Sequence, residues 1–221
     1  VYINNLNNCI CFYTTRHFAD NTNLLHTIDL SKKRNRNPTR NLNRDLKSLN
    51  HWLLAKKNSL ITKKTKIIYF RNRWTQIPKN NIKLHGVRLT STDNVKYVGV
   101  IFDEYLTFDK HIKTLNAKLK RANNLLAISR HYLPKPLLNQ IYYGQFYSHL
   151  TYGYQLWGKN KHKISQTIIL QKKSSGFSLF PTTKLPVAPL FKSQKLLKLT
   201  DIIKSNNILF THNTLNNKSS H

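Results

Sequence analysis

Acidic side chains are scarce in this chain, so few positions could supply a carboxylate to a metal ion. The 221 residues contain 8 Asp and Glu against 37 Lys and Arg, which gives a formal net charge of +29. Asp20 and Asn21 lie between two apolar stretches, at the expected tip of a β-hairpin. Taken alone, this pair is typical of Asx residues that close an ordinary turn. The adjacent acids Asp103 and Glu104 precede Thr107, where acids favour the start of a helix.

Basic side chains are the second source of chemistry, because they bind phosphate groups. They are spread along the whole chain, which predicts a folded surface or groove that follows a nucleic-acid backbone. One candidate is a basic loop at Lys32 to Arg36, and another is the polar face of a long helix after Asp103. A merely solvated face remains the alternative for that helix. Its basic residues are Lys110, Lys113, Lys118, Lys120 and Arg121.

The elements that position these residues follow from hydrophobic periodicity, which predicts a mixed α+β fold with antiparallel strands in the first half. A hairpin is expected within residues 11–30. A helix is expected over about 41–57, with Thr39 or Asn41 as its N-cap. Further strands are expected at 63–70, 82–90 and 95–102.

The second half of the chain has the periodicity of helices. Apolar residues recur at alternating four- and three-residue spacing from Phe108 to Ser129, which predicts a long helix capped by Thr107. The later elements are expected to be helices at about 136–158 and 162–173, a Pro-rich loop, amphipathic pieces over 190–210 and a disordered tail at 211–221.

Five stretches occur in an order that resembles a known family. They are VYINNLNNCI, HFADNTNLL, SLITKKTKIIYF, VKYVGVIFDEYLTFDKHI and QIYYGQFYSHLTYGYQLWG. Together they resemble the second half of a jockey-like, non-LTR retrotransposon reverse transcriptase, from Val1 to about Phe210. The resemblance implies a partial palm over 1–102, a helical thumb-like region over 103–175, and a connection segment with the disordered tail over 176–221.

The resemblance also gives the hairpin a chemical role. The family hairpin carries Phe/Tyr-Ala-Asp-Asp, so it implies that Asp20 is a catalytic aspartate and metal ligand, while Asn21 replaces the second aspartate. Polymerisation joins a primer 3′-hydroxyl to a nucleotide α-phosphate with two Mg²⁺ ions, which prefer charged oxygen ligands. Asn offers only a neutral carbonyl, so Mg²⁺ binding should weaken.

The ends of the chain lead to a further expectation. The sequence contains no Met and opens on Val1 within an amphipathic run. The family's other metal-binding aspartate would lie before Val1. We therefore expect the chain to be a fragment that is inactive by itself.

Downstream positions are implied to contact nucleic acid. The palm's Lys-Thr stretch approaches the phosphates of the incoming nucleotide, although Thr62 replaces the usual Asn; a solvated basic turn is the alternative. The matching lysines are Lys63, Lys64 and Lys66.

Tyr97 and Gly99 match the primer-grip hairpin, in which glycine permits close backbone approach. The alternative there is a buried strand with a glycine bulge. For the Tyr- and Trp-rich stretch SHLTYGYQLWG, helix packing explains the aromatics better than base stacking.

The sequence thus predicts part of an RNA-directed DNA polymerase from a mobile element, which retains salt-sensitive binding to RNA and RNA–DNA duplex. The alternative is a non-catalytic basic nucleic-acid-binding protein in which the Asp20 hairpin is only structural. A small ribosomal- or chromatin-type protein, or a Lys- and Asn-rich genome, would have a similar composition. A third possibility is that no stable protein forms, because the sheet exposes an unpaired apolar edge.

Compartment and membrane association are also predicted. Cys9 and Cys11 are too close for ordinary disulfide geometry and lack the second pair that a zinc site needs. They are therefore interpreted as buried apolar residues in a reducing compartment. The sequence contains no apolar run of membrane-spanning length and no signal-peptide pattern at Val1. An intracellular location, nuclear or cytoplasmic, without a membrane partner is expected.

Overall fold

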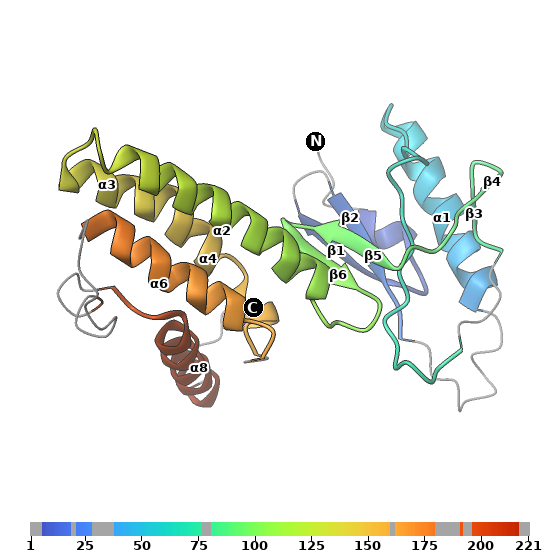
Figure 1. Ribbon diagram of the computed structural model, residues 1–221. Coiled ribbons are helices and arrows are strands. Elements are labelled where there is room, and N and C mark those ends of the chain that lie inside the picture. The colour runs from blue at the N-terminus through green and yellow to red at the C-terminus, as the bar shows by residue number, and fades with distance from the viewer. Residues whose placement is uncertain are drawn as a thin grey trace. The chain divides into compact units, whose positions relative to one another are not determined.

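The computed structural model describes residues 6–18, 21–27, 38–76, 81–159, 162–179, 191 and 196–216 (Figure 1). The chain divides into two compact units, Val1–Val95 and Lys96–His221. Helices and three two-stranded sheets make up the described part, which confirms the mixed α and β composition expected from the sequence.

A short 3₁₀ helix and a hairpin open the first unit. Helix η1 (Leu6–Cys9) leads into β1 (Thr14–Phe18) and β2 (Asn21–Leu25), which pair antiparallel. This pairing confirms the expected hairpin, although Asp20 lies outside the described residues. Within the described part of the chain, no third strand pairs with either edge of this hairpin.

Helix α1 (Pro38–Ala55) supplies one side of the first unit's core. Leu46 and Leu49 on its apolar stripe are buried together with residues of η1 and β3. Pro38 begins the helix, because the first turn does not need its missing N–H. The expected N-caps, Thr39 and Asn41, therefore lie inside the helix, and that prediction is wrong.

Two segments whose composition predicted single strands are hairpins, and the second is the segment for which the resemblance implied a hairpin at Gly99. The first consists of β3 (Lys83–Leu84) and β4 (Val87–Arg88), and the second of β5 (Asn94–Tyr97) and β6 (Val100–Asp103). Each is joined by two residues with positive φ, the geometry of a type I′ turn. The turn residues and their φ angles are His85 (51°), Gly86 (77°), Val98 (43°) and Gly99 (79°).

The strand expected at 63–70 does not form. In this stretch the structure has a turn at residues 62–64 and a single isolated bridge between Ile67 and Ser91. The β-branched and aromatic composition of the stretch favours a strand locally. It forms no continuous ladder with another described strand, so the expected strand is wrong.

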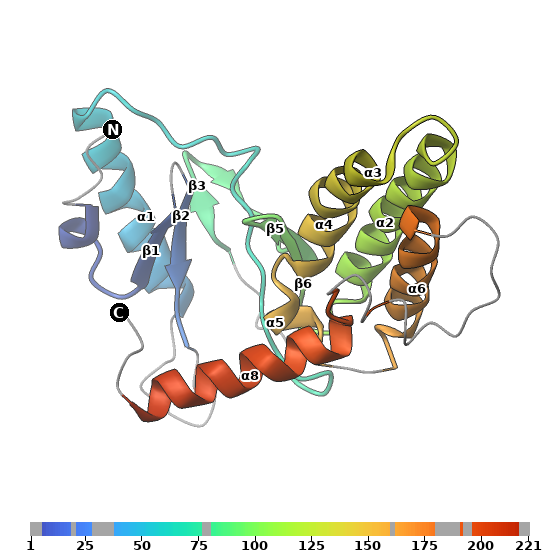
Figure 2. The same cartoon turned by 90° about the vertical axis from the view of Figure 1, so that its left-hand side faces the viewer.

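Helix α2 (Asp109–Ser129) dominates the second unit and confirms the long helix predicted after Phe108. Figures 1 and 2 show it side by side with α4 (Ser148–Thr151) and α6 (Ser165–Leu179). Its apolar stripe is buried in the unit's core. The buried residues of this stripe are Ile112, Leu115, Leu119, Ala122 and Leu126.

The expected helix over 136–158 is present in pieces. Helix α3 (Lys135–Ile141) continues through the π-helical η3 (Tyr142–Tyr147) into α4, and α5 (Tyr154–Trp157) follows a break. The break occurs at Gly153, whose φ of 62° is left-handed. Tyr154 and Trp157 are buried, which confirms packing for much of this aromatic stretch.

The last elements also differ from expectation. Helix α6 extends to Leu179, beyond the expected end near residue 173. Helix α8 (Leu199–Leu215) includes residues 211–215, which were expected to be disordered, so that prediction is wrong there. The Pro-rich stretch at 180–190 and the tail from 217 lie outside the described residues.

Candidate nucleic-acid interface

The outer face of α2 presents basic side chains opposite the buried stripe. At 3.6 residues per turn, they fall within roughly half of the helix circumference, along about 16 Å of its axis. All five side chains predicted for this face are exposed. They are Lys110, Lys113, Lys118, Lys120 and Arg121, and we call this set the α2 basic face.

A groove runs beside the α2 basic face, toward α6. It has a volume of about 440 Å³ and is lined by Lys113, Lys120 and Asn116 from α2, and by Lys163 and Gln166 from the segment that begins α6. Lys113 and Lys120 lie two turns apart on the same side of α2. The groove thus combines ammonium and amide groups, the types of side chain that bind phosphate oxygens.

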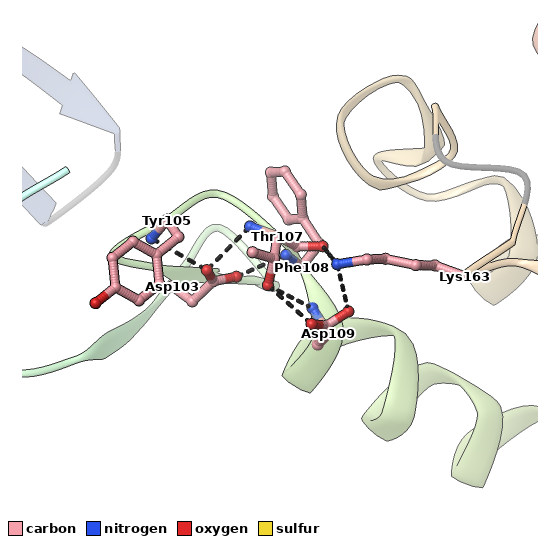
Figure 3. Close-up of polar contacts among 6 residues, drawn as sticks. All are labelled: Asp103, Tyr105, Thr107, Phe108, Asp109 and Lys163. Carbon is pink, nitrogen blue, oxygen red and sulfur yellow. Dashed lines mark hydrogen bonds and ion pairs between the residues drawn. The ribbon is translucent and has the colours of Figure 1, made fainter. Parts of the chain in front are cut away.

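Asp103 fixes the chain where it enters α2 (Figure 3). Its Oδ1 accepts hydrogen bonds from the backbone N–H groups of Tyr105 (3.2 Å) and Thr107 (2.9 Å), and its Oδ2 accepts one from Phe108 (2.6 Å). Partial burial raises the pKa of Asp103, but these N–H donors outweigh it and the net pKa is lowered. The structural role predicted for this acid is confirmed.

Phe108, and not Thr107, occupies the N-cap position of α2, and no side chain caps the helix there. The expectation that Thr107 caps this helix is therefore wrong. The Thr107 hydroxyl donates to the Asp109 carboxylate at 3.1 Å and accepts only a long hydrogen bond, of 3.5 Å, from the N–H of Asp109. The backbone conformation at this junction is held by the Asp103 carboxylate, five residues before Phe108.

Lys163 joins the start of α6 to the start of α2. Its Nζ forms an ion pair with Asp109 Oδ1 at 2.7 Å and donates to the carbonyl of Thr107 at 3.2 Å, as Figure 3 shows. Since Asp109 offsets the charge of Lys163, the positive potential of the groove depends on Lys113 and Lys120. Sequence reasoning missed Lys163, because its partner lies 54 positions earlier in the chain.

The hairpin implied to be catalytic is only partly described. Asn21 is exposed at the start of β2, and Phe18, at the end of β1, is 55% exposed. Asp20 and the basic loop Lys32 to Arg36 lie outside the described residues. Within the described part, no group of three or more His, Cys, Asp or Glu side chains comes together.

The lysines of the implied Lys-Thr stretch lie on an exposed turn. The turn is closed by hydrogen bonds from the N–H groups of Lys64 (3.0 Å) and Thr65 (3.1 Å) to the carbonyl of Ile61. The exposed lysines in and after it are Lys63, Lys64 and Lys66. Their contact with an incoming nucleotide stays a prediction.

Gly99 of the implied primer grip has a packing role in its own unit. A Cβ at this position would lie 3.0 Å from Cε1 of Tyr152. The hydroxyl of Tyr152 donates to the carbonyl of Val98 at 2.6 Å. Tyr97 is half-buried on β5. The structure thus explains why glycine suits this turn, while contact with a primer strand stays a prediction.

The cysteines differ from expectation. Cys11 is exposed and Cys9 is half-buried, and both are free thiols, so the prediction that both are buried is wrong. Burial raises the pKa of the Cys9 thiol, although a hydrogen bond from the backbone N–H of Cys9 opposes this shift. The thiol itself donates to the carbonyl of Leu6 at 2.9 Å. A raised pKa disfavours the reactive thiolate.

Comparison with known proteins adds no family assignment. No protein-family model, no curated protein and no solved structure matches this chain. Among the described helices, none has the length and apolar character needed to cross a bilayer. The α2 basic face and its groove are thus the features on which a functional proposal can be based.

Proposed function

We propose that this chain belongs to the palm and thumb region of a non-LTR reverse transcriptase, and that it binds RNA and RNA–DNA duplex through the α2 basic face. One observation carries the binding proposal: five exposed cations lie on the side of α2 opposite its buried stripe. The ordered motifs of the sequence support the family proposal. On this view the hairpins belong to the palm, and α2 with its neighbouring helices to the thumb.

The described residues do not form a Mg²⁺ site. Asn21 offers a neutral carbonyl, and no cluster of three potential ligands exists among the described residues. These 221 residues are expected to bind template and primer without extending the primer.

Binding is tested by fluorescence anisotropy with a labelled RNA–DNA duplex over a range of salt concentrations. The substitutions Lys113→Gln and Lys120→Gln should each weaken binding about five- to tenfold near 0.1 M salt and lower the slope of log K against log salt by about one. Each removes one cation from the groove and keeps a good helix former.

Lys204→Gln provides the matched control, because Lys204 is exposed on α8 of the same unit. It should change the affinity much less than either groove substitution. An equal loss in all three variants would mean that total charge, and not the α2 basic face, determines binding. That outcome would contradict the proposed interface.

A primer-extension assay with Mg²⁺ tests the catalytic part of the proposal. The chain should give no extended product, and Asn21→Asp alone should not restore extension, because one added carboxylate does not complete the ligand set. Extension that disappears on Asp20→Ala would contradict the expected inactivity. The family proposal and the non-catalytic alternative both expect duplex binding without extension. Restored extension when an upstream palm segment is added to the chain would support the family proposal over the non-catalytic alternative.

A further inference from the structure

The outer face of α1, in the first unit, carries a second line of cations. Arg40, Arg44 and Lys47 follow one another at spacings of four and three residues, so they lie on one face. All three are exposed, whereas Leu46 and Leu49 on the opposite side are buried. We call these three residues the α1 basic line.

No acid of α1 offsets this charge. The helix contains a single acid, Asp45, which is 1% exposed. Its carboxylate turns to the loop before β1 and accepts hydrogen bonds from the N–H groups of Cys11 (3.2 Å) and Phe12 (2.9 Å). Within the described part of the chain, no ion pair engages the α1 basic line.

The start of α1 adds further positive potential. The first turn contains no acid, and Arg40 lies there beside the positive end of the helix dipole. A cation is unfavourable at this position, because the dipole prefers negative charge at a helix N-terminus. A bound anion would remove this repulsion and engage Arg40 at the same time.

A groove and an aromatic contact define the surroundings of the line. The groove has a volume of about 610 Å³, and Thr39, Asn43 and Asn81 line it together with the three cations. Asn43 fixes its wall: Nδ2 donates to the carbonyl of Asn81 at 3.0 Å, and Oδ1 accepts from the N–H of Lys83 at 2.9 Å. The Arg44 guanidinium lies 5.8 Å from the centre of the Phe12 ring, which favours a restricted orientation.

We propose that the α1 basic line binds the phosphate backbone of a nucleic-acid duplex. The line spans about 10.5 Å of helix axis, long enough for its three cations to contact more than one phosphate of a strand. Arginine suits this contact, since its planar group binds phosphate oxygens in pairs. A membrane-bound helix would need exposed apolar residues beside its cations, whereas the main stripe of α1 is buried.

This inference deepens the proposed function, and it rests on that proposal only for the nature of the partner. It adds a contact surface in the first unit that is separate from the α2 basic face. The two surfaces can therefore be tested separately, each with its own variants and in the same binding assay.

The test uses the full chain and a labelled RNA–DNA duplex in anisotropy titrations at several salt concentrations. The variant Arg40→Gln/Arg44→Gln/Lys47→Gln should weaken binding about tenfold or more near 0.1 M salt and lower the salt slope by two to three, roughly one for each phosphate contact. The matched control is Lys56→Gln/Lys57→Gln/Arg73→Gln, which removes three exposed charges of the same unit away from the groove. It should reduce the affinity much less.

Stability gives a second readout. Arg40→Gln alone should leave the melting temperature unchanged or raise it, since it removes the repulsion at the helix start, while it weakens duplex binding. A fall in both stability and affinity would assign Arg40 a structural role and would overturn its part in the proposal. Circular dichroism of each variant shows whether the helix content is kept.

The outcomes separate the two proposals. An equal loss of duplex affinity in the triple variant and its control would overturn the α1 inference. The inference would also be overturned if the triple variant lost affinity for anionic lipid vesicles or for polyglutamate by the same factor as for the duplex. Wild-type affinity in the α1 variant with a loss in Lys113→Gln would overturn the α1 inference alone. The reverse pattern would overturn the α2 interface alone. No duplex binding by the wild-type chain would overturn both.

Discussion

Asp103 stabilises a loop that contains two non-glycine residues with left-handed backbone conformations. Leu106 has a φ of 53° and Phe108 a φ of 60°, and each such residue costs on the order of 1 kcal/mol. Between β6 and α2, the carboxylate accepts three backbone N–H groups from this loop. These hydrogen bonds offset the cost and fix the direction in which α2, with its basic face, begins.

Asp103→Asn should lower the free energy of unfolding by about 1–3 kcal/mol, because hydrogen bonds to a charged acceptor are replaced by weaker ones. The pKa of Asp103 is lowered in the folded state, so its ionised form stabilises the fold above the unfolded-state pKa of about 4. This contribution disappears as the pH falls through the folded-state pKa. Urea unfolding at decreasing pH should therefore show the difference between wild type and variant shrinking toward zero in acid.

The control for this measurement is Asp93→Asn, an exposed acid, which should change stability little at any pH. Buried His111 accepts a hydrogen bond from the N–H of Ile101 at 3.3 Å, and burial, followed by Lys118, lowers its pKa. Its protonation destabilises wild type and variants alike as the pH falls below the unfolded value. A difference between Asp103→Asn and wild type that is independent of pH would contradict the role of the Asp103 charge.

The β5–β6 hairpin shows how a turn depends on a distant element. Val98 is β-branched and has a φ of 43°, an unfavourable conformation for such a residue. The Tyr152 hydroxyl donates to the carbonyl of Val98, and the Tyr152 ring lies beside Gly99. The turn is thus held by the break between α4 and α5, more than fifty residues later.

Gly99→Ala should destabilise the second unit by about 1–2 kcal/mol, because alanine disfavours a φ of 79° and its Cβ would lie 3.0 Å from the Tyr152 ring. Thermal unfolding followed by circular dichroism of the helices measures the effect. Gly144→Ala is the matched control: a Cβ there meets no atom within 4 Å, so higher helix propensity should leave stability equal or increased. Equal destabilisation by both substitutions would contradict the strain argument.

At the scale of the whole molecule, charge is the dominant feature. A formal net charge of +29 on 221 residues produces repulsion that opposes the compact state. The basic faces of α1 and α2 concentrate part of this charge on exposed surfaces, where a polyanion would neutralise it. Under the proposed function, stability and nucleic-acid binding would therefore be linked through the same side chains.

Raising the salt concentration from about 10 mM to 150 mM should increase the melting temperature, because the Debye length falls from about 30 Å to 8 Å and the repulsion is screened. Addition of an RNA–DNA duplex at low salt should raise it further through binding to the folded state. Differential scanning fluorimetry measures both effects. A melting temperature that falls with added sodium chloride would show that attractive ion pairs outweigh the repulsion.

The sequence by itself determined the elements whose signal is local. The spacing of leucines and isoleucines in α2 predicted both its buried stripe and the exposure of its five cations, because one helical period fixes both faces. The β1–β2 hairpin and α1 followed from similar patterns. The resemblance implied a hairpin at Gly99, whereas residues 82–90 were predicted as one strand, since His85-Gly86 lacks the Asn or Asp that usually marks a type I′ turn.

Only the tertiary structure decided which distant residues meet. The ion pair between Lys163 and Asp109, the contact of the Tyr152 ring with Gly99, and the hydrogen bonds from the loop before β1 to Asp45 all join residues more than thirty positions apart. Such contacts depend on how the elements pack, and local propensity contains no information about their partners.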